Sequence, residues 1–140
     1  MAAAIAKPDP QPTSVLLLVE DHEDSRQMYA EFLKTSFDVV AAADAEQGLA
    51  VLRERRVDIV VTDLSLPGMN GLELVAEVRS DEALRAVPIV CLSGYGGSAH
   101  EQRARAAGCD RIVQKPCMPD ALADIATQLV REAASRSERS

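Results

Sequence analysis

The chain has 140 residues, with 15 Lys or Arg against 22 Asp or Glu and a formal net charge of −7. This length fits a single domain whose core buries most of the surface that the unfolded chain exposes. The acidic balance and the lack of a basic stripe exclude a protein that binds nucleic acid through its phosphates, because such binding depends on Lys and Arg.

Neither end of the chain indicates export or membrane insertion. Residues 1–14 contain three prolines and a short Ala-rich opening too interrupted for a signal-peptide core, so they are predicted as a disordered N-terminal tail. Residues 135–140 consist only of Ser, Arg and Glu and are predicted as a frayed C-terminal tail. No stretch approaches a membrane span. The three cysteines lack the spacing of a disulfide framework and indicate a cytoplasmic protein.

Five short runs rich in Val, Ile and Leu predict strands. In chain order these runs cover residues 15–19, 39–42, 59–62, 88–92 and, more weakly, 112–113.

Helical patterns separate these strands and follow the last of them. The first covers residues 23–35, the fourth covers 98–107, and the second and third begin after the capping residues Asp44 and Asn70. Pro119 suits the first turn of the last helix. That helix has an apolar stripe at i, i+3, i+4 and i+7, made by Leu122, Ile125, Ala126 and Leu129.

The strict alternation of strand and helix over residues 15–134 predicts one α/β domain. Parallel strands need crossover connections, and helices in those connections cover both faces of the sheet. The expected fold is therefore a three-layer, doubly wound, five-stranded parallel sheet.

Polar side chains follow four of the predicted strands at their carboxyl ends. They are Glu20 and Asp21, Asp63, Ser93 and Lys115. These ends meet at one edge of a parallel sheet, where open α/β folds place their ligands. Three carboxylates repel one another unless a cation lies among them, and an all-oxygen site with few ligands suits Mg²⁺. The lysine can pair with a carboxylate or a phosphoryl oxygen, and the serine hydroxyl can donate to an anion.

Each of these residues, taken alone, also has a purely structural explanation. The pair Glu20 and Asp21 can favour the N-terminus of the following helix. Asp63 can be a turn residue, Ser93 can belong to an ordinary glycine-rich loop, and Lys115 can simply leave a strand. The joint placement of all five residues favours a functional site.

As a set, these motifs resemble the receiver domain of two-component response regulators, and the resemblance covers residues 15–130. The motifs are Val19-Glu20-Asp21, Thr62-Asp63-Leu-Ser-Leu-Pro67-Gly-Met-Asn-Gly71, Cys91-Leu-Ser93-Gly94, and Gly108-Cys-Asp110 leading to Lys115-Pro116. The resemblance implies the flavodoxin-like strand order 2-1-3-4-5. It also implies a phosphoacceptor that signals, with self-phosphorylation and autodephosphorylation chemistry, in place of a conventional enzyme.

In this family Asp63 corresponds to the residue that accepts a phosphoryl group from a partner histidine kinase or histidine phosphotransfer protein. The resemblance implies that Asp21 and Asp63 bind Mg²⁺ directly together with the main-chain carbonyl of Ser65. Glu20 then holds the ion through a water molecule.

The two remaining site residues respond to phosphorylation by the same resemblance. Lys115 pairs with Asp63 before transfer and with the phosphoryl group afterwards, while Ser93 bonds the phosphoryl group. A downstream protein is expected to bind the face made by the helix 98–107, the strand 112–113 and the last helix. The chain departs from the family at Ile112, where an aromatic residue is usual, so activation is hypothesised to run mainly through the loop 93–98.

Several alternatives remain. A Mg²⁺-dependent phosphatase with an Asp nucleophile normally has a second Asp two residues later, where this chain has Ser65. A nucleotide-binding protein is a second alternative, but Gly94-Tyr-Gly-Gly97 matches neither a Walker loop nor G-x-G-x-x-G. The receiver itself is expected as a single-domain regulator, and the alternative is a fragment of a larger regulator or hybrid histidine kinase.

Overall fold

The computed structural model describes residues 14–94 and 98–139 of the chain. The predicted disordered tail thus lies, apart from Ser14, outside the described residues, and so does the centre of the loop 93–98. No helix in the described ranges is long and apolar enough to cross a membrane.

The described residues form one sheet of five parallel strands in the order β3-β2-β4-β5-β6. The strands are β2 (Val15–Val19), β3 (Asp38–Ala42), β4 (Ile59–Asp63), β5 (Ile89–Ser93) and β6 (Arg111–Gln114). Numbered along the chain this order is 2-1-3-4-5, so the flavodoxin-like topology is confirmed. Every residue of β2, β4 and β5 is buried, because helices cover both faces of the central strands.

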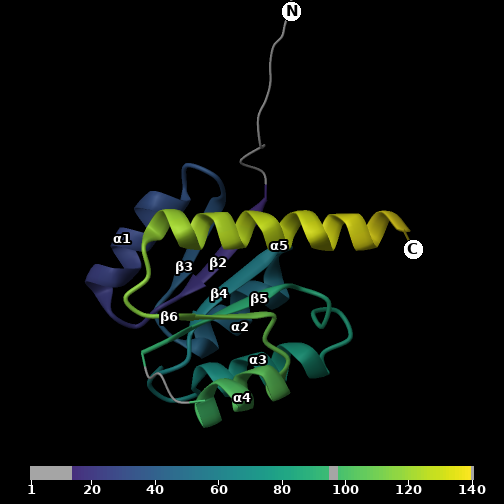
Figure 1. Cartoon of the computed structure of the whole chain (residues 1–140). Coiled ribbons are helices and arrows are strands. Elements are labelled where there is room, and N and C mark those ends of the chain that lie inside the picture. Colours follow the sequence, from purple (N-terminus) through teal and green to yellow (C-terminus); the bar gives the residue numbers. More distant parts are fainter. Residues whose placement is uncertain (1–13, 95–97, 140) are drawn as a thin grey trace, which may run out of the picture.

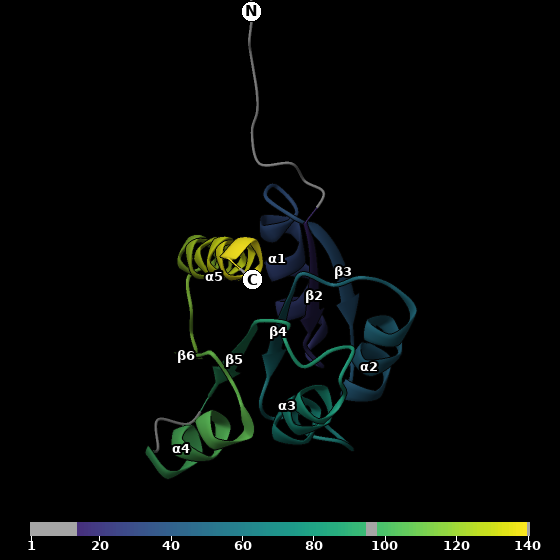
Figure 2. The same ribbon diagram turned by 90° about the vertical axis from the view of Figure 1, so that its right-hand side faces the viewer.

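Helices pack on the two faces of the sheet, which makes three layers (Figures 1 and 2). They are α1 (Glu23–Leu33), α2 (Ala45–Glu54), α3 (Gly71–Ser80), α4 (Ser98–Ala107) and α5 (Pro119–Arg139). On one face α1 and α5 share an apolar core with Leu16 and Leu18 of β2. On the other face α2, α3 and α4 share a core with Leu17 and Val19. Alternate residues of β2 thus serve opposite faces, as the pleat requires.

The predicted helix starts are found where side chains can cap them. The Asp44 side chain accepts a hydrogen bond from the N–H of Gln47 at 2.8 Å. Asn70 and Glu73 form a reciprocal capping box at the start of α3. These caps satisfy amide groups that have no partner within the helix.

The C-terminal end differs from the prediction. Residues 135–139, which the composition predicts as a tail, continue α5 as far as Arg139. Neither Gly nor Pro interrupts the chain after Pro119, so no local signal ends the helix earlier. The polar composition predicts no core-facing stripe in this segment, but such a segment can still be helical.

Candidate functional site

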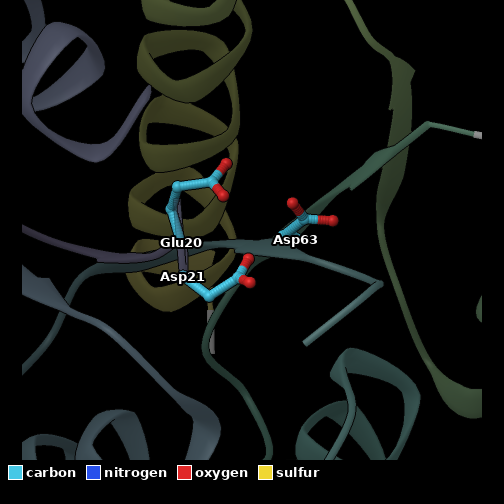
Figure 3. Close-up of side chains that lie close together, drawn as sticks. All are labelled: Glu20, Asp21 and Asp63. Carbon is cyan, nitrogen blue, oxygen red and sulfur yellow. The ribbon is translucent and has the colours of Figure 1, made fainter. Parts of the chain in front are cut away.

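Three carboxylates meet at the carboxyl edge of the two central strands. Glu20 follows β2 and Asp63 ends β4, and the register pairs Val19 with Thr62, so the residues that follow lie side by side. One ligand atom each from Glu20, Asp21 and Asp63 lies within 4.8 Å of the others. Figure 3 shows the three carboxylates turned toward a common space. Glu20 and Asp63 are buried and Asp21 is exposed, so the cluster opens to solvent at Asp21.

Lys115 bridges the two buried carboxylates. Its Nζ donates to Oε1 of Glu20 at 2.9 Å and to Oδ2 of Asp63 at 2.6 Å. The main-chain N–H of Lys115 donates to the carbonyl of Ser93 at 2.8 Å. This hydrogen bond joins the residue that follows β6 to the last residue of β5. Burial lowers the pKa of Lys115, but the hydrogen bonds to Asp63 and Glu20 outweigh it and hold the pKa above its ordinary value of 10.5. The ammonium is therefore charged throughout the neutral range.

The other carboxylate oxygens of these two residues accept main-chain N–H groups. Oδ1 of Asp63 accepts from Ser65 at 3.0 Å, and Oε2 of Glu20 accepts from His22 at 3.1 Å. Thr62 donates from its hydroxyl to the carbonyl of Asp63 at 3.0 Å. Both buried side chains are thus held in one orientation by a main-chain donor on one oxygen and the lysine on the other.

The donor set fits a hard divalent cation. Three carboxyl groups and one ammonium give this small volume a formal net charge of −2. The cluster offers only carboxylate oxygens, which are the ligands that Mg²⁺ prefers. A divalent cation bound here offsets the remaining charge, so the cluster is consistent with the magnesium site that the sequence predicts.

Ser93 and Ser65 also lie at this edge of the sheet. Ser93 ends β5, next to β4, and is almost fully buried. Ser65 contacts Asp63 through its N–H, and the role of its carbonyl as a metal ligand stays a prediction. Ile112 pairs with Cys91 in the sheet and packs against the core, half-buried.

Two further residues contribute to the site and were not predicted from the sequence. The N–H of His22 binds Glu20 through the main chain, which any residue type could do. Arg26 donates from its guanidinium to the main-chain carbonyls of Glu20 and Asp21, at 3.0 and 3.4 Å. The available signal was its place in the first turns of α1, because helical side chains point back toward the N-terminus.

We expect Glu20→Gln to stabilise the metal-free protein at neutral pH by about 1 kcal/mol, within the usual range for a single stabilising substitution. Burial raises the pKa of Glu20 above its ordinary value of 4.5, although the hydrogen bond from Lys115 opposes the shift. The folded state therefore holds this proton more tightly than the unfolded state, and ionised Glu20 costs stability as the pH rises above 4.5.

Urea unfolding with a chelator present measures this effect at about pH 4 and about pH 7. The gain from Glu20→Gln should be larger at the higher pH, whereas Glu54→Gln, a change at an exposed residue of α2, should give little at either. An equal gain at both pH values contradicts the expectation.

Known proteins share both the sequence pattern and the fold. The sequence model of the response regulator receiver domain family matches residues 16–127 of this chain. The polar-differentiation response regulator DivK of Brucella ovis is 27% identical over 105 residues, which cover 74% of this chain and 85% of the relative. DivK of Brucella anthropi is 28% identical over 106 residues, with coverages of 75% and 85%.

Solved structures of receiver proteins have the same fold as this chain. The chemotaxis response regulator CheY4 of Vibrio cholerae is 28% identical, with a TM-score of 0.78 over 83% of this chain and 98% of that chain. A CheY-like receiver domain protein from Methanospirillum hungatei JF-1 shares the fold, with a TM-score of 0.82 at 22% identity over 88% of this chain and 98% of that chain. Because the family match spans most of its length, the chain belongs to the response regulator receiver domain family.

Proposed function

We propose that this protein is a phosphoacceptor in two-component or phosphorelay signalling and that Asp63 receives the phosphoryl group. The observation that supports the proposal is the position of the Asp63 carboxylate and the groups around it. It ends a buried strand, lies in an acidic cluster suited to a divalent cation, and is paired with Lys115. The phosphodonor is a phosphohistidine on a histidine kinase or on a histidine phosphotransfer protein.

In the transfer step an oxygen of Asp63 forms a bond to phosphorus while the phosphorus–nitrogen bond of the phosphohistidine breaks. The electron pair of that bond leaves with the imidazole of the donor. Asp21, Asp63 and the Ser65 carbonyl would hold Mg²⁺ directly, with Glu20 helping through a water molecule, and the bound ion would supply charge neutralisation for the phosphoryl oxygens. The N–H of Ser65 orients the carboxylate for attack, because it holds one of its two oxygens.

After transfer Lys115 is expected to pair with the phosphoryl group, and Ser93 to donate to it. A hydrogen bond to a charged group contributes about 1.5–3 kcal/mol. Moving a two-state equilibrium from 1:99 to 99:1 requires about 5.5 kcal/mol. The serine alone is therefore insufficient, and Lys115 together with repacking of the nearby loop has to supply the remainder.

The output is proposed to be a protein contact made in the cytoplasm through the face of α4, β6 and α5. The curated relatives support a single-domain regulator, because the matched region is 85% of their own length. The three cysteines are free, which supports the proposed compartment. A receiver that belongs to a larger regulator or hybrid histidine kinase remains the alternative architecture.

Incubation with Mg²⁺ and a small-molecule phosphodonor tests the proposal. Intact-protein mass spectrometry should show one phosphoryl adduct that hydroxylamine removes. Asp63→Asn should abolish the adduct, and Asp124→Asn, at an exposed carboxylate of α5, should leave it unchanged. Failure of the wild-type protein to form the adduct, or its persistence in Asp63→Asn, contradicts the proposal.

A further inference from the structure

Arg26 lies on α1 but makes its side-chain contacts with the connection between β2 and that helix. Its Nη1 donates to the carbonyl of Glu20 at 3.0 Å and to the carbonyl of Asp21 at 3.4 Å. The N–H of Arg26 closes the first helical turn by donating to the carbonyl of His22 at 2.9 Å. One residue therefore holds the acidic connection through both its backbone and its side chain.

Arg26 donates to main-chain carbonyls although several carboxylates lie near it in the sequence. Glu23 and Asp24 occupy the first turn of the same helix, and Asp21 precedes it. Within residues 14–94 and 98–139, none of these carboxylates forms an ion pair with Arg26. The guanidinium donates to carbonyl oxygens. It therefore holds the path of the main chain and leaves the carboxylates available to a cation.

We propose that Arg26 is a positioning residue for the cation site. By holding the carbonyls of Glu20 and Asp21 from the helix side, it sets the direction in which the exposed Asp21 carboxylate points toward Asp63. Asp21 needs such support because its side chain lies at the solvent-exposed side of the cluster, whereas Glu20 and Asp63 are buried and held by Lys115. The inference rests on the cation site of the proposed function.

Charge and geometry predict opposite effects for this residue. Removing a positive charge beside a cluster of net charge −2 strengthens its attraction for Mg²⁺ if only electrostatics matters. Removing the hydrogen bonds that orient a ligand weakens cation binding, and outer partners of metal ligands typically contribute about 10–100-fold in affinity. The sign of the change therefore separates a positioning role from a simple contribution to local charge.

The experiment is a Mg²⁺ titration of the full chain followed by amide chemical shifts, which report folding and affinity together and suit a protein without tryptophan. Arg26→Met removes both the charge and the donors and should weaken binding about tenfold. Arg26→Lys keeps the charge, but its shorter side chain ends in an ammonium that does not reach the position of Nη1, so its affinity should lie between those of Arg26→Met and the wild type. Arg53→Met, at an exposed arginine of α2 that pairs with Glu77, is the matched control and should bind as the wild type does.

Arg26→Met binding Mg²⁺ as tightly as the wild type, or more tightly, overturns the inference and leaves the proposed function intact. A wild-type protein that does not bind Mg²⁺ overturns the cation site itself and this inference with it. If the amide spectrum shows that Arg26→Met is unfolded, Arg26→Lys decides the question. Weaker binding by a folded Arg26→Lys supports positioning, since the charge is kept, and unchanged binding overturns it.

Discussion

Lys115→Met is expected to lower the free energy of unfolding of the metal-free protein by about 3 kcal/mol, the low end for removing one partner from a buried ion pair. The side chains of Glu20 and Asp63 are 0% and 6% exposed. The substitution leaves their two carboxylates close together without the lysine ammonium that pairs with both. The lysine side chain is itself 25% exposed, so solvent softens the loss.

Urea unfolding with a chelator present provides the measurement, and Lys34→Met provides the matched control. Lys34, which follows the last residue of α1, pairs with Glu31 at 2.8 Å, and both side chains are mostly exposed, so its loss should change stability by no more than about 0.5 kcal/mol. Equal effects of the two substitutions contradict the expectation.

The pH dependence of the Lys115 contribution has a definite sign. Because the pKa of Lys115 is raised in the folded protein, its stabilisation is fully present below the ordinary value of 10.5 and is lost only as the pH rises through the higher folded value. The deficit of Lys115→Met should therefore persist across the neutral range. Added Mg²⁺ should reduce it, because a divalent cation then offsets the same two carboxylates.

Gly71→Ala is expected to cost about 3 kcal/mol in stability, the upper part of the usual range for overpacking. A Cβ at this position would overlap the carbonyl oxygen of Asp63 and lie 2.7 Å from Cα of Leu64. Both are main-chain atoms, so no side chain can yield, and either α3 or the end of β4 has to move. The N–H of Gly71 also donates to the carbonyl of Leu64 at 3.1 Å, which locks the two segments together.

The same substitution should reduce phosphorylation of the folded fraction about 100-fold, because a displacement of about 1 Å at a reacting group has effects of that order. Thermal unfolding and adduct formation measure the two consequences separately. Gly94→Ala is the control for stability, because a Cβ there has no atom of the described residues within 4 Å. A fully stable Gly71→Ala protein shows that the close approach is not a constraint.

Local signals in the sequence account for the elements that were predicted correctly. The capping residues Asp44 and Asn70 and the buried runs of β2, β4 and β5 are local signals, and the structure has each of them as predicted. The extension of α5 through residues 135–139 was not predicted, because a helix without an apolar stripe has no periodic signal.

By itself, the sequence determined that strands and helices alternate, and hence that the sheet is parallel. A parallel sheet brings the carboxyl ends of its strands to one edge, so Glu20, Asp63 and Ser93 were expected at the same edge. The strand order that makes them neighbours was implied only by the family resemblance. The shared edge follows from short-range patterns, because each strand is a contiguous apolar run and each crossover a contiguous helix.

Only the tertiary structure decided which atoms meet at that edge. Lys115 joins Glu20 and Asp63 across 95 and 52 residues of chain, and it could have paired with either one alone. Arg26 had carboxylates close by in sequence and contacts carbonyls instead. Strand register, side-chain rotamers and burial select such partners, and these follow from the packing of the whole domain; no single segment of the chain contains them.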